Sequence, residues 1–341
     1  MGLEELTERE RKVFLSIVRS FIQTAEPVGS RYLAKNYDLQ ISPATVRNVM
    51  NDLEEKGLVK QPHTSAGRVP TDIGYRQYVD SAMEQFTIDD YEKQKIIEQM
   101  SKFSEDLDII SEKASQVLGE ISSQLGIVLA PRFSQGKIEK IELVFLTEKK
   151  FLLVLGVQLG LVKTIIVEIE QCIAPNILQA TNEVLNERLY GLSIDELQSF
   201  MEKRFRDVDA KIKIFIKAIQ EKTDRIFQPK TDFYFAGTKN VISHPEFETR
   251  EKMSKILELI DRKDILIRVI NEHQGTPGVS IVIGEENKED LMKNCSLITT
   301  SYEIQGAAGT LGVIGPTRMQ YAKVISLVEF MSETLSYLFK K

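Results

Sequence analysis

The stretch ISPATVRNVMNDLEEKGLV begins at residue 41 and carries small and polar side chains at a regular spacing. This spacing would let them form hydrogen bonds with a planar chemical group. Ala44, Asn48 and Asn51 follow one another at three and four residues, so a helix would place them on one face, with Thr45 and Arg47 beside them. An asparagine amide can pair with an adenine edge, a guanidinium with guanine, and a methyl group can contact thymine. These residue types therefore fit the readout of base edges in DNA.

Neighbouring residues delimit the helix that would carry this face. Ser42 is a favourable N-cap, Pro43 suits the first helical position, and Gly57 follows the last turn. Four apolar residues form a stripe on the opposite side, at i, i+3, i+4 and i+7: Val46, Val49, Met50 and Leu53. Because this stripe must pack on other helices, we expect the polar face to point outward.

Two further helices and a hairpin are predicted around this helix. Thr7 and Glu10 form a capping box at the start of a helix over about 7–23, and Ser30 is expected to cap a short helix, RYLAKNY. After the third helix, LVKQ and VP flank the turn-rich PHTSAGR, as two strands of a wing would. This order is typical of a winged helix-turn-helix, whose third helix enters the major groove with its N-terminal half against base edges.

The predicted DNA contacts follow from that geometry. Arg68, beside Gly67 in the wing, is expected to reach a phosphate or the minor groove. The simpler alternative is that the polar face is only solvated, as on most amphipathic helices, but the joint occurrence of helices, stop signals and wing favours DNA binding. The predicted DNA-contacting residues are Ser42, Ala44, Thr45, Arg47, Asn48, Asn51 and Arg68.

Composition and charge narrow the class of protein. The 341 residues are 42% hydrophobic and 8% aromatic, which is ordinary for a globular protein of two or three domains. The net charge of −6 argues against a uniformly basic coat for nucleic acid, yet residues 27–76 hold seven Lys and Arg against five Asp and Glu. No apolar run approaches the length of a membrane span, so we expect a cytoplasmic protein with no membrane partner.

Helical and strand patterns continue beyond the wing. A helix from Thr71 is predicted with an apolar side made of Tyr75, Tyr78, Val79, Ala82 and Met83. A later seam has heptad-like spacing, and it can either pair helices between subunits or pack a helix on the sheet of its own domain: Phe103, Leu107, Ile110, Ala114, Val117 and Ile121. Both interpretations stay open at this point.

An interrupted sheet is predicted for the remainder. Three β-branched runs from residue 138 predict an antiparallel meander, and helices are predicted over about 175–188, 193–206, 209–227 and 245–259. Strand signals return near Gly278 with VSIVIG, CSLITTSYEI and TLGVIGP, before a closing helix over 319–339. A sheet begun before about residue 170 and completed after about residue 278 implies one α/β domain with a mainly helical insertion.

Few parts of a catalytic or metal site are recognisable. The histidines, His63, His244 and His273, lie in unrelated contexts, and no nucleophile has a local signature. Cys172 and Cys295 lack the spacing of a zinc site or a disulfide framework, and we expect both to be buried. We therefore predict no enzyme activity and no metal site.

A glycine-rich stretch near the C-terminal end is the nearest match to a phosphate loop, with Gly306, Gly309, Gly312 and Gly315 at three-residue intervals. A dinucleotide fingerprint follows a strand and opens a helix, whereas here Leu311 to Ile314 resumes a strand. We interpret the glycines as a turn between strands and expect no cofactor.

Two long segments are distinctive, PVGSRYLAKNYDLQISPATVRNVMNDLEEKGLVKQPHTSAGRVPTDIGYRQYVD and the C-terminal GTLGVIGPTRMQYAKVISLVEFMSETLSYLF. Both resemble the HrcA family of heat-inducible transcription repressors. The resemblance implies a winged-helix DNA reader, a GAF-like domain and an inserted dimerising domain. It further implies a homodimer that represses chaperone operons at an inverted-repeat operator in double-stranded DNA and is released on heat stress, with the chaperonin GroEL assisting its active state.

The predicted architecture is therefore α+β and multidomain. An N-terminal winged helix-turn-helix is followed by a GAF-like α/β domain, into which a mainly helical dimerisation domain is inserted. Its expected parts are a winged-helix domain at 1–85, a helical linker at 86–110, a GAF-like domain at 111–189 and 276–341, and the insertion at 190–275. Two alternatives stay open: a winged-helix regulator whose GAF-like domain senses a small metabolite, and an enzyme fused to a DNA-binding module.

Overall fold

A computed structural model provides the structure of the chain. It describes residues 6–64, 66–81, 83, 85–102, 107–131, 137–157, 161–170, 172, 175–193, 196, 204–226, 233–272, 278–304 and 307–338. Internal contacts divide the chain into two compact units. The first unit comprises residues 1–130, 233–302 and 310–341, and the second comprises residues 131–232 and 303–309.

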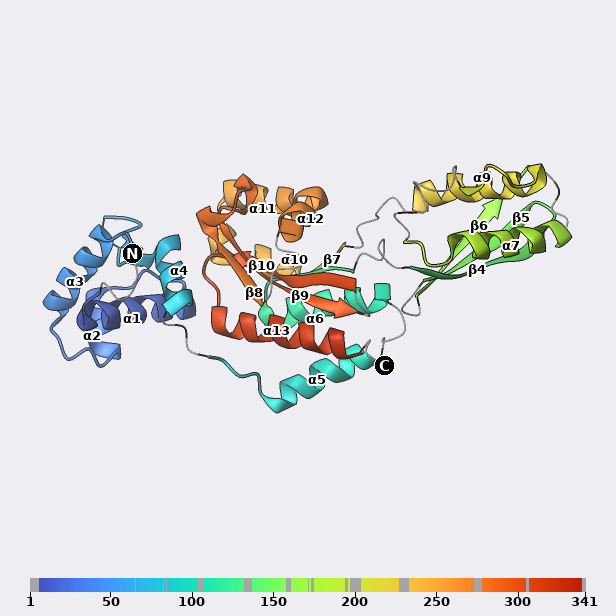
Figure 1. Ribbon diagram of the computed structural model, residues 1–341. Helices are drawn as coiled ribbons and strands as arrows, with labels where there is room; N and C mark the ends of the chain where they lie inside the picture. Colours follow the sequence, from blue (N-terminus) through green and yellow to red (C-terminus); the bar gives the residue numbers. More distant parts are fainter. Residues whose placement is uncertain are drawn as a thin grey trace. The chain divides into compact units, whose positions relative to one another are not determined.

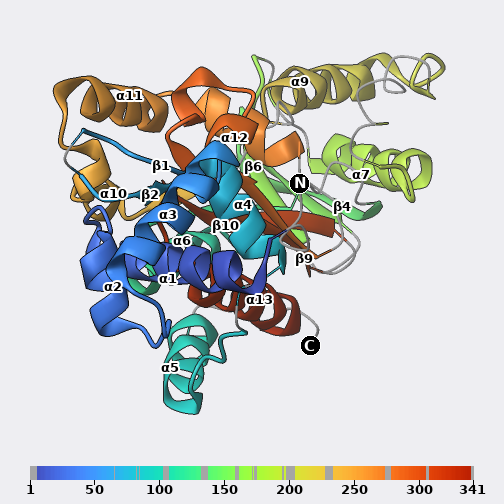
Figure 2. The same cartoon turned by 90° about the vertical axis from the view of Figure 1, so that its left-hand side faces the viewer.

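The first unit begins with what we call the N-terminal module, residues 6–81. Its helices and its two-stranded ribbon are α1 (Glu8–Thr24), α2 (Ser30–Asn36), α3 (Pro43–Glu55), β1 (Val59–Lys60), β2 (Val69–Pro70) and α4 (Asp72–Ser81). Helices α1, α2 and α3 pack together, and the ribbon lies beside the end of α3 (Figure 2). The module is α-helical with a small antiparallel ribbon, in the element order that the sequence predicts.

Local capping signals account for these boundaries. The capping box of Thr7 and Glu10 is formed, and the Ser42 side chain accepts a hydrogen bond from the backbone N–H of Thr45, as an N-cap should. Gly57 has φ of 72°, a left-handed conformation that glycine adopts without strain. The expected cap at Ser30 is wrong by one position: Gly29 is the N-cap, and Ser30 is already helical.

A five-stranded sheet forms the rest of the first unit. Its spatial order is β7 (Phe233–Ala236), β3 (Leu125–Leu129), β10 (Ala307–Pro316), β9 (Cys295–Ile304) and β8 (Val279–Ile283). One face carries α6 (Leu107–Ser122) and α13 (Tyr321–Leu338), with α5 (Asp90–Ser101) beyond them, and the other carries α10 (Thr238–Ile242), α11 (Arg250–Asp261) and α12 (Lys263–Glu272) (Figure 1). Short 3-10 helices lie at Pro245–Phe247, Gly284–Glu286 and Asp290–Met292.

The predicted heptad-like seam packs within this unit. Ile110, Ala114 and Val117 are all buried, and α6 contacts β3, β7 and α13. Of the two interpretations left open, the described part of the seam therefore fits a helix packed on its own sheet. Phe103 lies outside the described residues.

The second unit contains a separate three-stranded sheet. Its elements are β4 (Ile138–Thr147), β5 (Lys150–Val157), β6 (Leu161–Glu168), α7 (Pro175–Leu189) and α9 (Ala210–Ile226). The predicted meander is confirmed, because β4 pairs antiparallel with β5 and β5 with β6. One face of this sheet is buried with α7 and α9 in a common hydrophobic core.

The meander belongs to a different sheet from the one that the sequence led us to expect. We expected its strands to share a sheet with the strands after residue 278, but among the described residues they form a three-stranded sheet of their own. The compact second unit accordingly begins near residue 131, whereas the insertion was expected over 190–275. Alternating apolar residues show that a strand has a buried face, and they do not show which strand lies beside it.

Three smaller expectations also differ. The helix predicted over 245–259 is a short 3-10 helix followed by α11, because Thr249 caps a new helix at Arg250. Cys295 is buried as expected, but Cys172 is exposed. The helix predicted over 193–206 lies mostly outside the described residues. Within the described part of the chain, no helix has the length and apolar character needed to cross a membrane.

Candidate nucleic-acid interface

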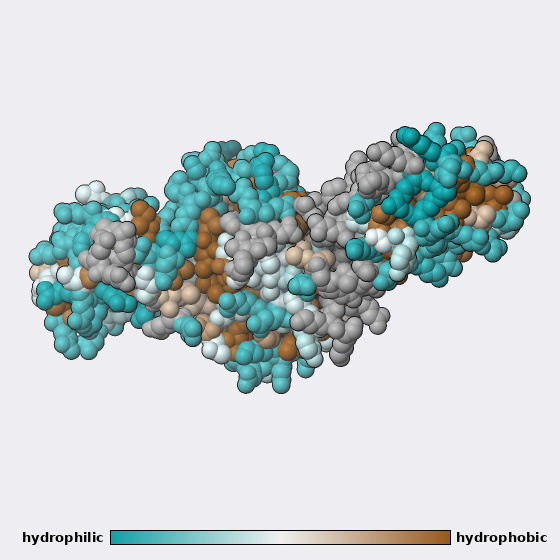
Figure 3. All heavy atoms as spheres, viewed as in Figure 1, coloured by the Kyte–Doolittle hydropathy of each residue, from teal (hydrophilic) through white to brown (hydrophobic). Residues whose placement is uncertain are grey.

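Helix α3 has one buried and one exposed face, as its sequence predicts. All four residues of the apolar stripe, Val46, Val49, Met50 and Leu53, are buried against the rest of the module. On the other side, Ala44, Arg47, Asn48 and Asn51 are exposed. The viewed surface of the module is mostly hydrophilic (Figure 3). The structure thus brings these four predicted contact residues together on one accessible surface.

Ser42 and Thr45 lie at the N-terminal end of that surface and bond to each other. The Ser42 Oγ accepts from the Thr45 N–H at 3.2 Å, and the two hydroxyl oxygens are 2.9 Å apart. Ser42 is exposed and Thr45 half-buried. Their first role is therefore to begin the helix.

Arg68 occupies a different environment from the solvated or phosphate-binding one predicted. Its Nη2 lies 2.8 Å from the Glu54 Oε2 and donates a hydrogen bond of 2.9 Å to the Asn51 Oδ1. Only 13% of the side chain is exposed, and its buried Nε has no hydrogen-bond partner within the described structure. The ribbon is thus joined to the outer face of α3 through this guanidinium.

The backbone of the ribbon is fixed at the same place. Val28 and Arg68 exchange two backbone hydrogen bonds of 2.9 Å, which tie the ribbon to the segment before α2. Directly after β1, the Gln61 N–H donates to the Glu54 side chain at 3.0 Å, and the Gln61 side-chain amide donates to the Thr64 and Ala66 carbonyls across the turn. These hydrogen bonds therefore fix the backbone position from which the Arg68 side chain extends.

An ion pair joins α1 to the C-terminal end of α3. The Lys56 Nζ lies 2.6 Å from the Glu10 Oε1, and only 10% of the Glu10 side chain is exposed. The Lys56 ammonium, with the Thr7 backbone N–H, holds the pKa of Glu10 below its ordinary value. Glu10 also completes the capping box, so one carboxylate both begins α1 and fixes α3 against it.

Within the first unit, polar contacts also connect the module to the five-stranded sheet. Arg76 on α4 pairs with Glu286 and donates to the Ile281 carbonyl at 2.6 Å, while the Asp72 carboxylate accepts from the Glu285 N–H at 3.0 Å. Gly284 permits this approach, because a Cβ there would lie 2.0 Å from the Asp72 Oδ2. Arg318, which precedes α13, donates to the Ile22 carbonyl at 2.9 Å.

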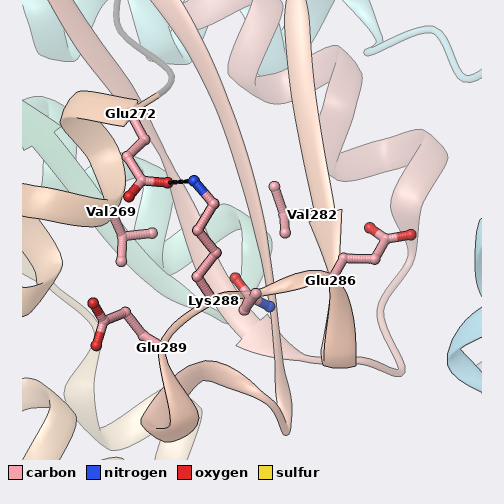
Figure 4. Close-up of a pocket in the computed structure, with 7 residues that line it drawn as sticks. Val269, Glu272, Val282, Glu286, Lys288 and Glu289 are labelled. Atoms are coloured by element: carbon pink, nitrogen blue, oxygen red, sulfur yellow. Dashed lines mark hydrogen bonds and ion pairs between the residues drawn. The ribbon is translucent and has the colours of Figure 1, made fainter.

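A shallow hollow of about 310 Å³ lies beside this contact, between α12 and the segment after β8. Its carboxylates are already paired, Glu272 with Lys288, Glu286 with Arg76 and Glu289 with Arg268. In Figure 4 the Glu286 and Glu289 side chains point away from each other, and only Glu272 and Lys288 meet. The hollow therefore offers no converging set of side chains comparable to the surface of α3.

Other residues considered from the sequence are not brought together. His63 is exposed in the turn of the ribbon, His244 contacts the Ser123 carbonyl at 3.0 Å through its Nε2, and His273 lies outside the described residues. The predicted glycine turn between strands is wrong for the described glycines, because Gly309, Gly312 and Gly315 lie within β10; Gly306 is outside the described residues. The described residues contain no group of three or more His, Cys, Asp or Glu placed to hold a metal ion.

Comparisons with known proteins identify the family. A family model described as "HrcA protein C terminal domain" matches residues 108–325. A protein of Prosthecochloris aestuarii named heat-inducible transcription repressor HrcA is 38% identical over 348 aligned positions, which cover 98% of each chain. The chain belongs to the HrcA family of heat-inducible transcription repressors. An HrcA protein of Chlorobium phaeobacteroides is 37% identical, with 99% of each chain covered.

A solved structure supports the fold of the HrcA-family chain. It is the crystal structure of a hypothetical protein with 21% sequence identity and a TM-score of 0.68, covering 98% of this chain and 99% of the other. At this level of identity the likeness concerns the fold alone. The α+β architecture of the chain is therefore shared over nearly its full length with an experimentally determined structure.

Proposed function

We propose that this HrcA-family chain represses heat-shock chaperone operons by binding an inverted-repeat operator with its N-terminal module, acting as a winged helix-turn-helix. The observation that carries the proposal is the outer face of α3, where Ala44, Arg47, Asn48 and Asn51 are exposed together while the opposite stripe is buried. A helix with such a face fits the major groove, in which amide and guanidinium groups distinguish base pairs. The repressor then acts by binding and not by catalysis.

The exposed residues divide by what they can contact. Asn48 lies near the centre of the outer face and is suited to a base edge, and Arg47 at its margin can read guanine or hold a phosphate. Ala44 and the Thr45 methyl group at the N-terminal end can contact a thymine methyl. Ser42 fixes the end of the helix that enters the groove.

We further propose that the active species is a homodimer. One recognition helix reads only a few base pairs, so a two-fold protein on an inverted repeat doubles the site. The second unit offers a surface for the partner copy, because the outer face of its sheet carries an apolar patch beside the Lys150–Glu168 ion pair: Val144 and Ile166 both stand opposite Leu152, and Val162 lies further along β6. Val144, Val162 and Ile166 are 40%, 60% and 57% exposed.

Heat release would follow from competition for a chaperonin. If the repressor needs GroEL to reach its active state, unfolded proteins that occupy GroEL lower the active fraction by mass action. This part of the proposal is supported by the family resemblance and places the repressor in the cytoplasm. Adding chaperonin and ATP to a partly inactive preparation should raise operator binding; no change in binding would contradict it.

The DNA-binding proposal is tested with the full-length protein. Footprinting on chromosomal DNA should reveal a protected inverted repeat, and isotherms on that duplex and on a scrambled duplex should differ at physiological salt. A variant lacking residues 131–232 of the second unit, with β3 joined to β7 by a short linker, should bind the repeat more weakly if it is monomeric with an intact N-terminal module. Equal affinity for both duplexes, or unchanged affinity of a monomeric variant, would contradict the proposal.

The metabolite-sensing alternative makes a separate prediction. If the five-stranded sheet with its flanking helices is a GAF-like sensor, the purified protein should retain a small molecule, and removing that molecule should change operator affinity. Mass spectrometry of the denatured protein would detect it. In the hollow beside Glu286, Glu272 pairs with Lys288, and Glu286 and Glu289 pair with Arg76 and Arg268 outside its lining, so its carboxylates are not left for a ligand.

A further inference from the structure

The contact between Arg68 and Asn51 constrains how α3 can read DNA. Arg68 lies 17 residues from Asn51 in sequence, on the ribbon, and its Nη2 donates to the Asn51 Oδ1 at 2.9 Å. The same nitrogen pairs with Glu54 at 2.8 Å, one helical turn further along α3. A side chain expected to reach outward to the DNA backbone is thus directed onto the recognition helix.

We propose that Arg68 is a positioning residue that fixes the amide of Asn51, so that Asn51 reads DNA as a hydrogen-bond donor. This inference rests on the proposed DNA-binding function. It assigns Arg68 a part in sequence specificity, and not in the general attraction of DNA.

The orientation of the amide follows from hydrogen-bond chemistry. A guanidinium has only donors, so the Asn51 oxygen must face Arg68, and the NH₂ group must point away from it. The usual uncertainty about which amide atom is oxygen is thereby removed. Bidentate pairing with adenine needs both the oxygen and the NH₂ group, and Arg68 occupies one of the two acceptor positions of that oxygen, whereas the NH₂ group is directed away from Arg68. Asn51 then donates to an acceptor on a base edge, such as a purine N7, guanine O6 or thymine O4.

The charge of Arg68 is poorly placed for a phosphate. Glu54 lies 2.8 Å from the guanidinium and offsets its charge, and only 13% of the Arg68 side chain is exposed. Its backbone is held by two hydrogen bonds with Val28, so the side chain cannot swing outward without loss of the Glu54 and Asn51 contacts. Removing a true phosphate contact lowers the slope of log affinity against log salt by about one unit. Removing a positioning residue leaves that slope unchanged.

The test uses a double-mutant cycle on the full-length protein. A preferred duplex is first selected by the protein from a random-sequence library, and isotherms on it and on a scrambled duplex are then measured at several salt concentrations. The variants are Asn51→Ala, Arg68→Ala, Arg68→Lys and the double variants with Asn51→Ala. Lys60→Ala is the matched control, because Lys60 is an exposed charge on β1 of the same ribbon.

We expect Asn51→Ala to lower the preference for the selected duplex roughly 5- to 150-fold. Arg68→Ala should lower the same preference with an unchanged salt slope, and should add nothing to the loss in the Asn51→Ala background. Arg68→Lys keeps the charge but lacks the planar fork, so it should also lose preference. If Arg68→Ala fails to melt cooperatively, the Arg68→Lys cycle decides the question by itself.

The opposing results are distinct. Equal weakening on both duplexes with a lower salt slope, or losses that add in the double variant, would assign Arg68 to a phosphate and overturn the inference. If the library yields no preferred duplex, the proposed DNA-binding function fails instead.

A modified duplex tests the donor role directly. At the purine whose preference Asn51→Ala relaxes, replacing N7 by a carbon should weaken wild-type binding and leave the Asn51→Ala variant unaffected. If the contacted base is thymine, the corresponding change removes the O4 acceptor. An unchanged wild-type affinity for every such duplex would overturn donation by Asn51.

Discussion

Arg76 donates two hydrogen bonds to the Glu286 carboxylate, from Nε at 2.8 Å and from Nη2 at 2.6 Å. The arginine belongs to α4 of the N-terminal module, and the glutamate follows β8 of the five-stranded sheet, 210 residues away in sequence. Bidentate pairs of this kind are geometrically specific. The module is therefore held to the sheet by a contact whose strength can be changed without altering the proposed DNA surface.

Exchanging the two charges should test this attachment. Arg76→Glu or Glu286→Arg alone should raise hydrogen exchange at the amides of α4 and β8, since each places like charges together. The double exchange should restore protection partly, because the pair is re-formed but the hydrogen bond to the Ile281 carbonyl is lost. Lys288→Glu, in the same segment but away from α4, is the control. Full protection in both single variants would show that the pair does not hold the module.

The same pair predicts a dependence on pH. Burial raises the pKa of Glu286, but hydrogen bonds from Arg76 and the Ile283 N–H outweigh it, so its pKa lies below the ordinary 4.5. The ionised form is thus favoured in the folded state, and its contribution is present above pH 4.5 and lost as pH falls below it. Wild type should exceed Glu286→Gln in unfolding free energy by at most about 1 kcal/mol at neutral pH, because the pair is partly exposed. A difference that persisted unchanged well below that pH, by denaturant titration, would refute the assignment.

Val49→Asp should unfold the N-terminal module. Val49 is 6% exposed in the buried stripe of α3, and an unpaired carboxylate there costs about 3–5 kcal/mol. Asn48→Asp places the same carboxylate on the exposed neighbour and should change the melting temperature little. Circular dichroism melting of both proteins is sufficient; similar melting curves would mean that the stripe is not a core.

Asn48→Ala should change specificity and leave folding intact. If Asn48 reads a base, the change removes about 1–3 kcal/mol of discrimination at one position of the operator. Asn36→Ala, which changes an exposed asparagine on α2, serves as the matched control. Isotherms on duplexes varied one base pair at a time locate the affected position. If the affinity for the operator and for the scrambled duplex falls equally, or does not fall, that face is only solvated and reads no base.

Ile166→Glu should weaken the proposed homodimer. The change places a charge in the apolar patch on the outer face of the second sheet and should raise the dimer dissociation constant at least about tenfold, or 1.4 kcal/mol. Tyr190→Glu, at a side chain that is 70% exposed in the turn after α7, is the control. Sedimentation over a range of concentrations measures both. A dimer as tight as the wild type in the Ile166→Glu variant would place the interface elsewhere.

Local signals predicted most of the N-terminal module because its boundaries depend on neighbouring residues. The Thr7 and Glu10 capping box, the Ser42 cap and the stripe that includes Val49 each lie within one helix, where spacing determines which side chains meet. The composition of the outer face of α3 follows from the same periodicity, so its residues could be named from sequence.

The contacts made by Arg68 could not be predicted in this way. They join Arg68 to Asn51 and Glu54 through tertiary packing that no local pattern records, whereas the position of Arg68 beside Gly67 in a turn-rich segment suggested a side chain that reaches outward to DNA. The pairing of Arg76 with Glu286 and the separation of the meander from the other sheet are non-local for the same reason. Strand patterns define faces, whereas the choice of partner strand depends on the whole fold.

In the part of the sheet that the structure describes, β8 is the outermost strand at one side, so one row of its backbone groups has no neighbouring strand there. Arg76 covers the Ile281 carbonyl on that row, and the Glu286 carboxylate accepts from the Ile283 N–H. An uncovered strand edge is a template to which another chain can add by β-sheet pairing. By covering this edge, helix α4 therefore also hinders aggregation. A repressor whose N-terminal module had separated from the sheet would expose the edge of β8, to which another copy of the chain can pair.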